Sequence, residues 1–170
     1  MDLRRCLQGH LHECRFIPLT AITSLITPER VRETLISRGL SIETYPIDHI
    51  VSVAPRVFAI LVLAEGVHHI KDFIDKGLSD DSLPMDEAVI PDFETKDGKL
   101  HFIRIQRKFP PLFEKPKHLE LPDDTVLPFL EQTYVDNGSF GMVYKIKVAE
   151  GYLPESTSVR AVILPPYLSH

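Results

Sequence analysis

The chain has little of several features that mark specialised classes of protein. Its 170 residues contain no tryptophan and only two cysteines, Cys6 and Cys14. Two cysteines do not make a disulfide framework, so we expect free thiols. The longest apolar run, residues 57–64, is much shorter than the roughly 18 residues of a membrane span, and no apolar signal-peptide segment follows the N-terminus. We therefore expect an intracellular, cytoplasmic protein.

The chain also lacks a strong excess of charge of either sign. Its formal net charge is −5, with 24 acidic residues against 19 lysines and arginines. This balance gives no electrostatic reason to bind nucleic acid or an anionic membrane, and neither is expected as a partner. The hydrophobic content of 44% can supply a core for one domain or for two small ones.

The first 79 residues predict a small helical domain. Leucines recur at helical spacing over residues 3–14. Thr27 can cap a helix over about 28–38, with Pro28 at its first position and Gly39 just past its end. Residues 57–64 are apolar on every side, which predicts a buried central helix, with Pro55 either at its first position or at a kink. A short amphipathic helix is expected over about 67–76.

No metal ligand is predicted anywhere in the chain. Cys6, His10 and Cys14 share one face of the first expected helix, but a single helix face cannot surround a tetrahedral metal. His68 and His69 lie in the first turn of a helix that we expect at the surface. Histidines in such a position usually face water.

Residues 80–127 predict a connection that is acidic, then basic, and rich in proline. Residues 80–97 carry seven carboxylates and lack a calcium-binding loop pattern, so we interpret them as solvated. Residues 99–117 are basic, and the two segments could pair with one another. Leu100 and Ile103 indicate one short helix within the basic part.

Residues 128–170 predict a small antiparallel sheet. Two β-compatible runs flank a turn that contains Gly138 and Gly141, and residues 158–164 predict a third strand. The expected fold class is therefore α+β, a helical N-terminal domain followed by an incomplete three-stranded antiparallel sheet.

The run Gly-Ser-Phe-Gly-Met-Val-Tyr-Lys, residues 138–145, resembles the glycine-rich loop of protein kinases. The family pattern is Gly-x-Gly-x-x-Gly-x-Val, and Asp136 stands at the position of its first glycine. Together with the helical region, residues 80–84, residues 109–113 and residues 127–129, the run resembles the N-terminal part of protein-kinase-like proteins from filamentous fungi. The resemblance implies the first strands of a kinase small lobe over about 128–164.

The resemblance also implies a nucleotide site. Gly138 and Gly141 would let the loop fold over nucleotide phosphates, Ser139 and Phe140 would form its tip, and Val143 would pack on the adenine. ATP and Mg²⁺ are the cofactors implied for a full kinase domain, and this chain by itself is expected to bind ATP weakly.

The machinery of phosphoryl transfer is missing from these 170 residues. Transfer needs a lysine on the third strand, a catalytic aspartate and a metal-binding aspartate. The third strand carries Arg160 and no lysine, and no His-Arg-Asp or Asp-Phe-Gly occurs. We therefore assign no catalytic residue and expect an N-terminal fragment of a serine/threonine protein-kinase-like protein that is inactive alone. The alternative is a non-catalytic interaction module whose helical region docks a protein partner.

Overall fold

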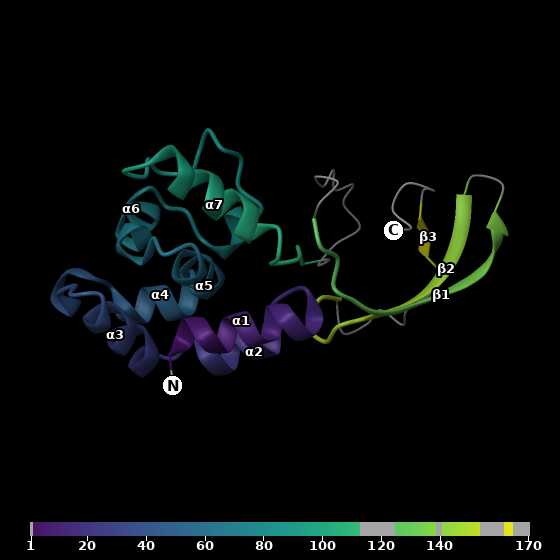
Figure 1. The fold of residues 1–170 in the computed structure, drawn as a ribbon, viewed down its shortest axis with the longest axis horizontal. Helices are drawn as coiled ribbons and strands as arrows, with labels where there is room; N and C mark the ends of the chain where they lie inside the picture. The colour runs from purple at the N-terminus through teal and green to yellow at the C-terminus, as the bar shows by residue number, and fades with distance from the viewer. Residues whose placement is uncertain (1, 113–124, 139–140, 154–161, 165–170) are drawn as a thin grey trace.

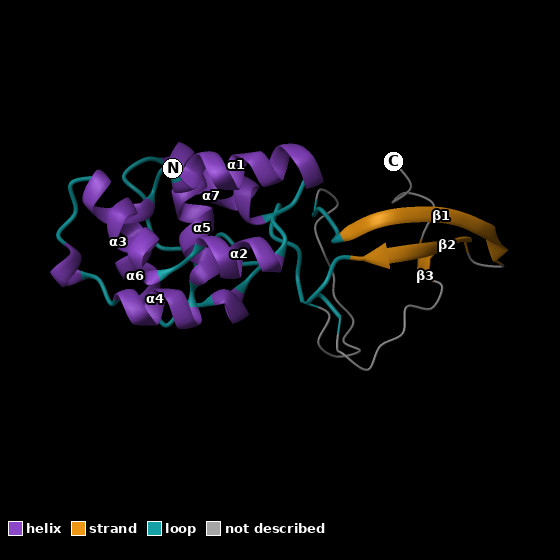
Figure 2. Ribbon diagram, turned by 90° about the horizontal axis from the view of Figure 1, so that it is seen from below, coloured by secondary structure: helices purple, strands orange, loops and turns teal. Residues whose placement is uncertain are grey.

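The computed structural model describes residues 2–112, 125–138, 141–153 and 162–164. Within these ranges seven α-helices gather into one unit, and a long β-hairpin extends away from them (Figures 1 and 2). The predicted α+β class is confirmed.

The helical unit is built from short helices joined by tight turns. The predicted N-terminal cap of the third helix is confirmed, because the Thr27 hydroxyl accepts a hydrogen bond from the Arg30 N–H. Gly39 and Gly77, which follow the third and sixth helices, have positive φ angles. The bounds are α1 Leu3–Cys14, α2 Leu19–Leu25, α3 Pro28–Ser37, η1 Ile42–Thr44, α4 Ile47–Val53, α5 Pro55–Leu63, η2 Val67–His69, α6 Ile70–Asp75, η3 Asp80–Ser82 and α7 Lys96–Gln106.

Helix α5 is the centre of this unit. Every residue from Arg56 to Leu63 is buried, and α1, α2, α4, α6 and α7 all pack against α5. The prediction of a buried central helix is confirmed. Pro55 occupies its first turn, where a missing N–H costs no hydrogen bond.

The N-terminus of α5 is closed by a carboxylate from a distant part of the chain. The N–H groups of Arg56 and Val57 donate to the Asp80 carboxylate at 3.0 Å. Burial raises the pKa of Asp80, while these two donors act to lower it. The buried Arg56 guanidinium donates to the carbonyls of Phe109 and Pro110, at 3.0 and 2.5 Å. These contacts tie residues 80 and 109–110 to the start of the central helix.

The interpretation of residues 80–97 as a solvated connection is wrong for part of that segment. Met85 and Ile90 are buried in the same core as α5, and so is Phe102 of α7. The Gln106 side chain accepts from the Met85 N–H at 2.9 Å and donates to the Met85 carbonyl at 2.8 Å. Apart from Asp80, the carboxylates of this segment are exposed.

The sheet follows the helices. Strands β1 (Phe129–Gly138) and β2 (Gly141–Val148) pair antiparallel, and β3 (Val162–Leu164) pairs antiparallel with β2 in the order β1-β2-β3. Residues 158–161 of the predicted third strand lie outside the described residues. Irregular register near Phe129 and Val135 bends β1.

A second apolar cluster joins the base of the hairpin to the helices. Phe16, Ala149 and Tyr152 are buried together, with the Phe16 and Tyr152 rings edge to face at 6.1 Å. The Tyr152 hydroxyl donates to the Ile17 carbonyl at 2.9 Å, and burial raises the pKa of Tyr152 to about 12. The hairpin is therefore attached at its base, through the connection between α1 and α2.

We predict that Leu61→Ala lowers the free energy of unfolding by about 2–5 kcal/mol, because it leaves a cavity beside a fully buried helix. Ile36→Ala is the matched control, since the Ile36 side chain is 59% exposed and should cost under about 1 kcal/mol. Urea unfolding followed by circular dichroism measures both. Equal losses would contradict the central role of α5.

Tyr152→Phe should cost about 1 kcal/mol at neutral pH, because the Ile17 carbonyl loses its buried donor. The pH dependence has a definite sign. An unfolded tyrosine ionises near pH 10 and the folded Tyr152 near 12, so its contribution is present below pH 10 and is lost as the pH rises towards 12.

Urea unfolding at a series of pH values between 8 and about 11 tests this sign, since the wild type should lose stability above pH 10 more steeply than Tyr152→Phe. Tyr134→Phe is the control, because Tyr134 lies exposed on the hairpin. A pH profile unchanged by Tyr152→Phe would contradict the prediction.

Candidate functional site

The glycine-rich tip of the hairpin contains most of the predicted site residues. Gly138 and Gly141 are directly opposite one another, as the last pair of the β1–β2 ladder. Ser139 and Phe140, between them, lie outside the described residues. Glycine carries no Cβ, so a ligand can come close to the backbone at Gly138 and Gly141. Such a tip can bring amide N–H groups close to an anion.

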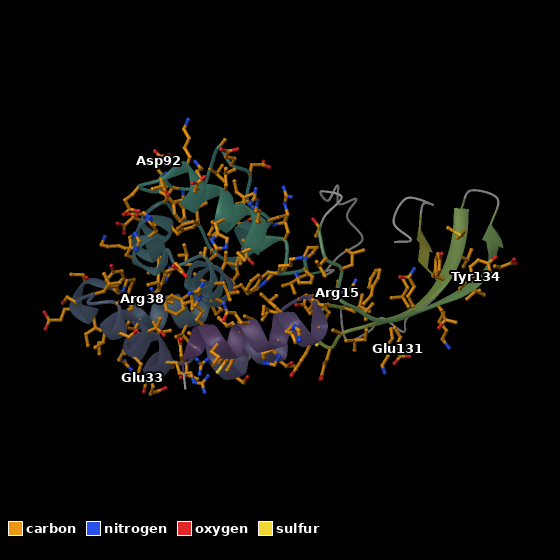
Figure 3. The ribbon with its side chains drawn as sticks, viewed as in Figure 1. Arg15, Glu33, Arg38, Asp92, Glu131 and Tyr134 are labelled. Carbon is orange, nitrogen blue, oxygen red and sulfur yellow. The ribbon has the colours of Figure 1, made fainter. Side chains whose placement is uncertain are left out.

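The two faces of the hairpin differ in character. Tyr134 and Tyr144 pack edge to face across the strands, with ring centroids 5.9 Å apart. Val143 is half-buried and, by strand alternation, belongs to the opposite face from Tyr144. Near the base, Lys147 donates to Glu131 at 2.7 Å, and this bond lowers the pKa of Glu131. Figure 3 labels Glu131 and Tyr134 on the hairpin, with Tyr134 farther from the helical unit.

A second group of functional side chains lies on the helical unit. The Nε2 atoms of His68 and His69 each lie 3.0 Å from an oxygen of the Glu94 carboxylate, one histidine at each oxygen. The Nδ1 atom of His69 lies 3.0 Å from Oδ2 of Asp72. The three candidate ligand atoms of His68, His69 and Glu94 all lie within 4.8 Å of one another. No other such group of His, Cys, Asp or Glu side chains occurs in the described part of the chain.

The fold positions these side chains through an aromatic cluster. His68 and His69 end η2, and Glu94 follows Phe93 in the segment before α7. The Phe93 ring packs on the His69 ring, with 4.2 Å between centroids. It meets the Phe73 ring edge to face and the Phe102 ring at a tilt. Phe93 also lies so close to Gly66 that a Cβ there would come within 2.9 Å of its ring. The cluster therefore holds Glu94 against the two histidines.

The expectation that both histidines face water is wrong for His69. The His69 residue is 6% exposed, whereas the His68 side chain is 42% and that of Glu94 69% exposed. Sequence reasoning missed Glu94 because it lies 25 residues from His69 and belongs to a segment interpreted as solvated. The spacing of His69 and Asp72, three residues apart, was the one local signal.

Cys6 and Cys14 are free and half-buried on α1, as expected for residues spaced along one helix. None of the described helices has the length and apolar character needed to cross a membrane. Neither a protein-family model, nor a curated protein, nor a solved structure matches this chain.

We predict that Gly66→Ala lowers the free energy of unfolding by about 1–3 kcal/mol, because the new Cβ forces Phe93 out of its packed position. Gly9→Ala is the matched control. No atom lies within 4 Å of a Cβ at Gly9, and alanine in the middle of α1 should stabilise by about 0.5–1 kcal/mol.

Opposite shifts of the urea midpoint in the two glycine variants are the expected result. A neutral or stabilising effect of Gly66→Ala would show that Phe93 does not hold this segment in place.

Proposed function

We propose that this chain is the N-terminal portion of a serine/threonine protein-kinase-like protein, in which the hairpin is the nucleotide-phosphate loop of a small lobe. The helical unit serves as the base that carries the hairpin. The chain binds the phosphates of ATP weakly and does not transfer them.

The pairing of Gly138 with Gly141 is the observation that carries this proposal. It places the two glycines at the end of a hairpin whose strands are ten and eight residues long. The antiparallel pairing of β1 with β2 supports the hairpin on which this proposal depends. The ends of β1 and β2 that carry these glycines lie at the end of the hairpin away from the helices (Figure 2).

The chemistry of the tip limits the proposal to binding. Backbone N–H groups can hold phosphate oxygens, but phosphoryl transfer also requires a third-strand lysine, a catalytic aspartate and a metal-binding aspartate, and the kinase motifs that carry them do not occur in this sequence. Asp136, where the kinase pattern has its first glycine, is exposed and lies two residues before Gly138. Small ligands bind tightly only where they are largely buried, so a single hairpin gives low affinity.

A non-catalytic interaction module is the second candidate, and the outer strand β1 favours it. Leu130, Tyr134 and Val135 of β1 are each at least half exposed. β1 ends the strand order of the sheet, so it can pair with an extended segment of a protein partner. Large exposed apolar side chains of the helical unit are scattered instead, at Ile36, Val53, Val89 and Leu100. The hairpin is thus a better docking surface than the helical region.

Calorimetric titration of the whole chain with ATP and Mg²⁺ tests the first candidate. We expect weak binding, with a Kd of about 0.1–1 mM, and its loss in the double variant Gly138→Val/Gly141→Val. Two valines would place side chains beside the amides that approach the phosphates.

Glu131→Gln is the matched control, because it changes the base of the same hairpin and leaves the tip intact. Its affinity should equal that of the wild type. Absence of heat at several millimolar ATP, or equal binding by the double-valine variant, would refute a phosphate loop and leave the interaction module.

A further inference from the structure

We propose that His68, His69 and Glu94 form a binding site for a divalent transition-metal ion, with zinc as the expected occupant. The proposal concerns the helical unit and does not depend on whether the hairpin binds nucleotide.

The surroundings of His69 indicate a cation between its ring and Glu94. Its two ring nitrogens face carboxylate oxygens on opposite sides, Asp72 at Nδ1 and Glu94 at Nε2, both at 3.0 Å. A neutral imidazole carries one proton, so it can donate to only one of them. With Nδ1–H donating to Asp72, the Nε2 lone pair faces a carboxylate oxygen directly. Either a second proton or a metal ion must lie between these two atoms.

His68 favours the metal ion over the second proton. Its Nε2 atom lies 3.0 and 3.3 Å from the two oxygens of the same Glu94 carboxylate. Two imidazole nitrogens and one carboxylate thus lie within 4.8 Å of one another, and two histidines with one glutamate are a known set of zinc ligands. Zinc–ligand bonds of about 2.0–2.1 Å in a tetrahedron require ligand atoms roughly 3.3 Å apart. The two nitrogen–oxygen separations of 3.0 Å need only a small expansion to reach this value, and all three ligand atoms lie within 4.8 Å of one another.

The neighbourhood supplies the outer contacts that metal sites use. A ligating histidine commonly donates its other N–H to a carboxylate, which fixes the tautomer and the orientation of the ring. Asp72 stands in that position for His69. The buried His69 ring is held by Phe93, whereas His68 and Glu94 are exposed and leave the outer side of the site open to water.

The donor set selects the class of ion. Calcium and magnesium prefer sites built from oxygen ligands alone. Imidazole nitrogen suits zinc, copper, nickel and iron. Three protein ligands with an open fourth position fit zinc with a bound water. Binding would fasten the segment that ends at Glu94 to η2, which otherwise meet through aromatic packing and hydrogen bonds.

Zinc titration of the whole chain against a chromophoric chelator is the test. The parent is Cys6→Ser/Cys14→Ser, which removes both thiols as competing ligands. We expect one equivalent of Zn²⁺ to bind and to raise the melting temperature, since a ligand that binds the folded state stabilises it. Glu94→Gln and His68→Ala should each weaken binding by about tenfold or more. His69 is left intact because its removal would also disturb the core.

Two further variants separate a metal site from a structural one. Asp72→Ala should weaken zinc binding about 10–100-fold through the lost orientation of His69. His49→Ala, which removes an exposed histidine from α4, should leave the affinity unchanged. The proposal is overturned if the parent shows no thermal shift with excess Zn²⁺, or if Glu94→Gln and His68→Ala bind as tightly as the parent.

Discussion

Burial of helix α5 is the constraint on which the remaining structure depends. An apolar helix must be covered on all sides, and α1, α2, α4, α6 and α7 provide that cover. Burying the helix also buries its first N–H groups, which therefore need acceptors inside the protein. Asp80 meets that need, and the Arg56 guanidinium, buried with the helix, finds the carbonyls of residues 109 and 110. The segments at residue 80 and at residues 109–110 therefore supply the hydrogen-bond acceptors that the buried polar groups of α5 need.

The hairpin depends on this unit in a different way. It joins the helices through the small cluster around Phe16 and Tyr152 at its base, while most of β1 is exposed. The ends of β1 and β2 that carry Gly138 and Gly141 lie away from the helices. The same arrangement suits a loop that receives a small anionic ligand and a strand edge that receives a partner. The chemistry of Gly138 and Gly141 favours the first, and the exposed apolar residues of β1 favour the second.

The histidine–carboxylate group arises from the packing of the core. Phe93 enters the aromatic cluster with Phe73 and Phe102, and the chain then delivers Glu94 to the ends of His68 and His69. Gly66 is required there because any side chain would displace Phe93. The pKa of Glu94 is lowered, first by a hydrogen bond from its own backbone and also by its hydrogen bond to His69.

The sequence by itself determined the features that are encoded locally. Thr27, Pro28 and Gly39 bound α3, the apolar run after Pro55 forms the buried helix, and two glycines mark the hairpin tip. Helices α2 and α4 were missed because both are short and rich in β-branched residues, and the burial of Ile22 and Ile50 stabilises them. The packing of Met85 and the meeting of Glu94 with His69 were decided by tertiary structure alone. Both join residues more than 20 positions apart, and no periodicity or spacing within one segment carries that information.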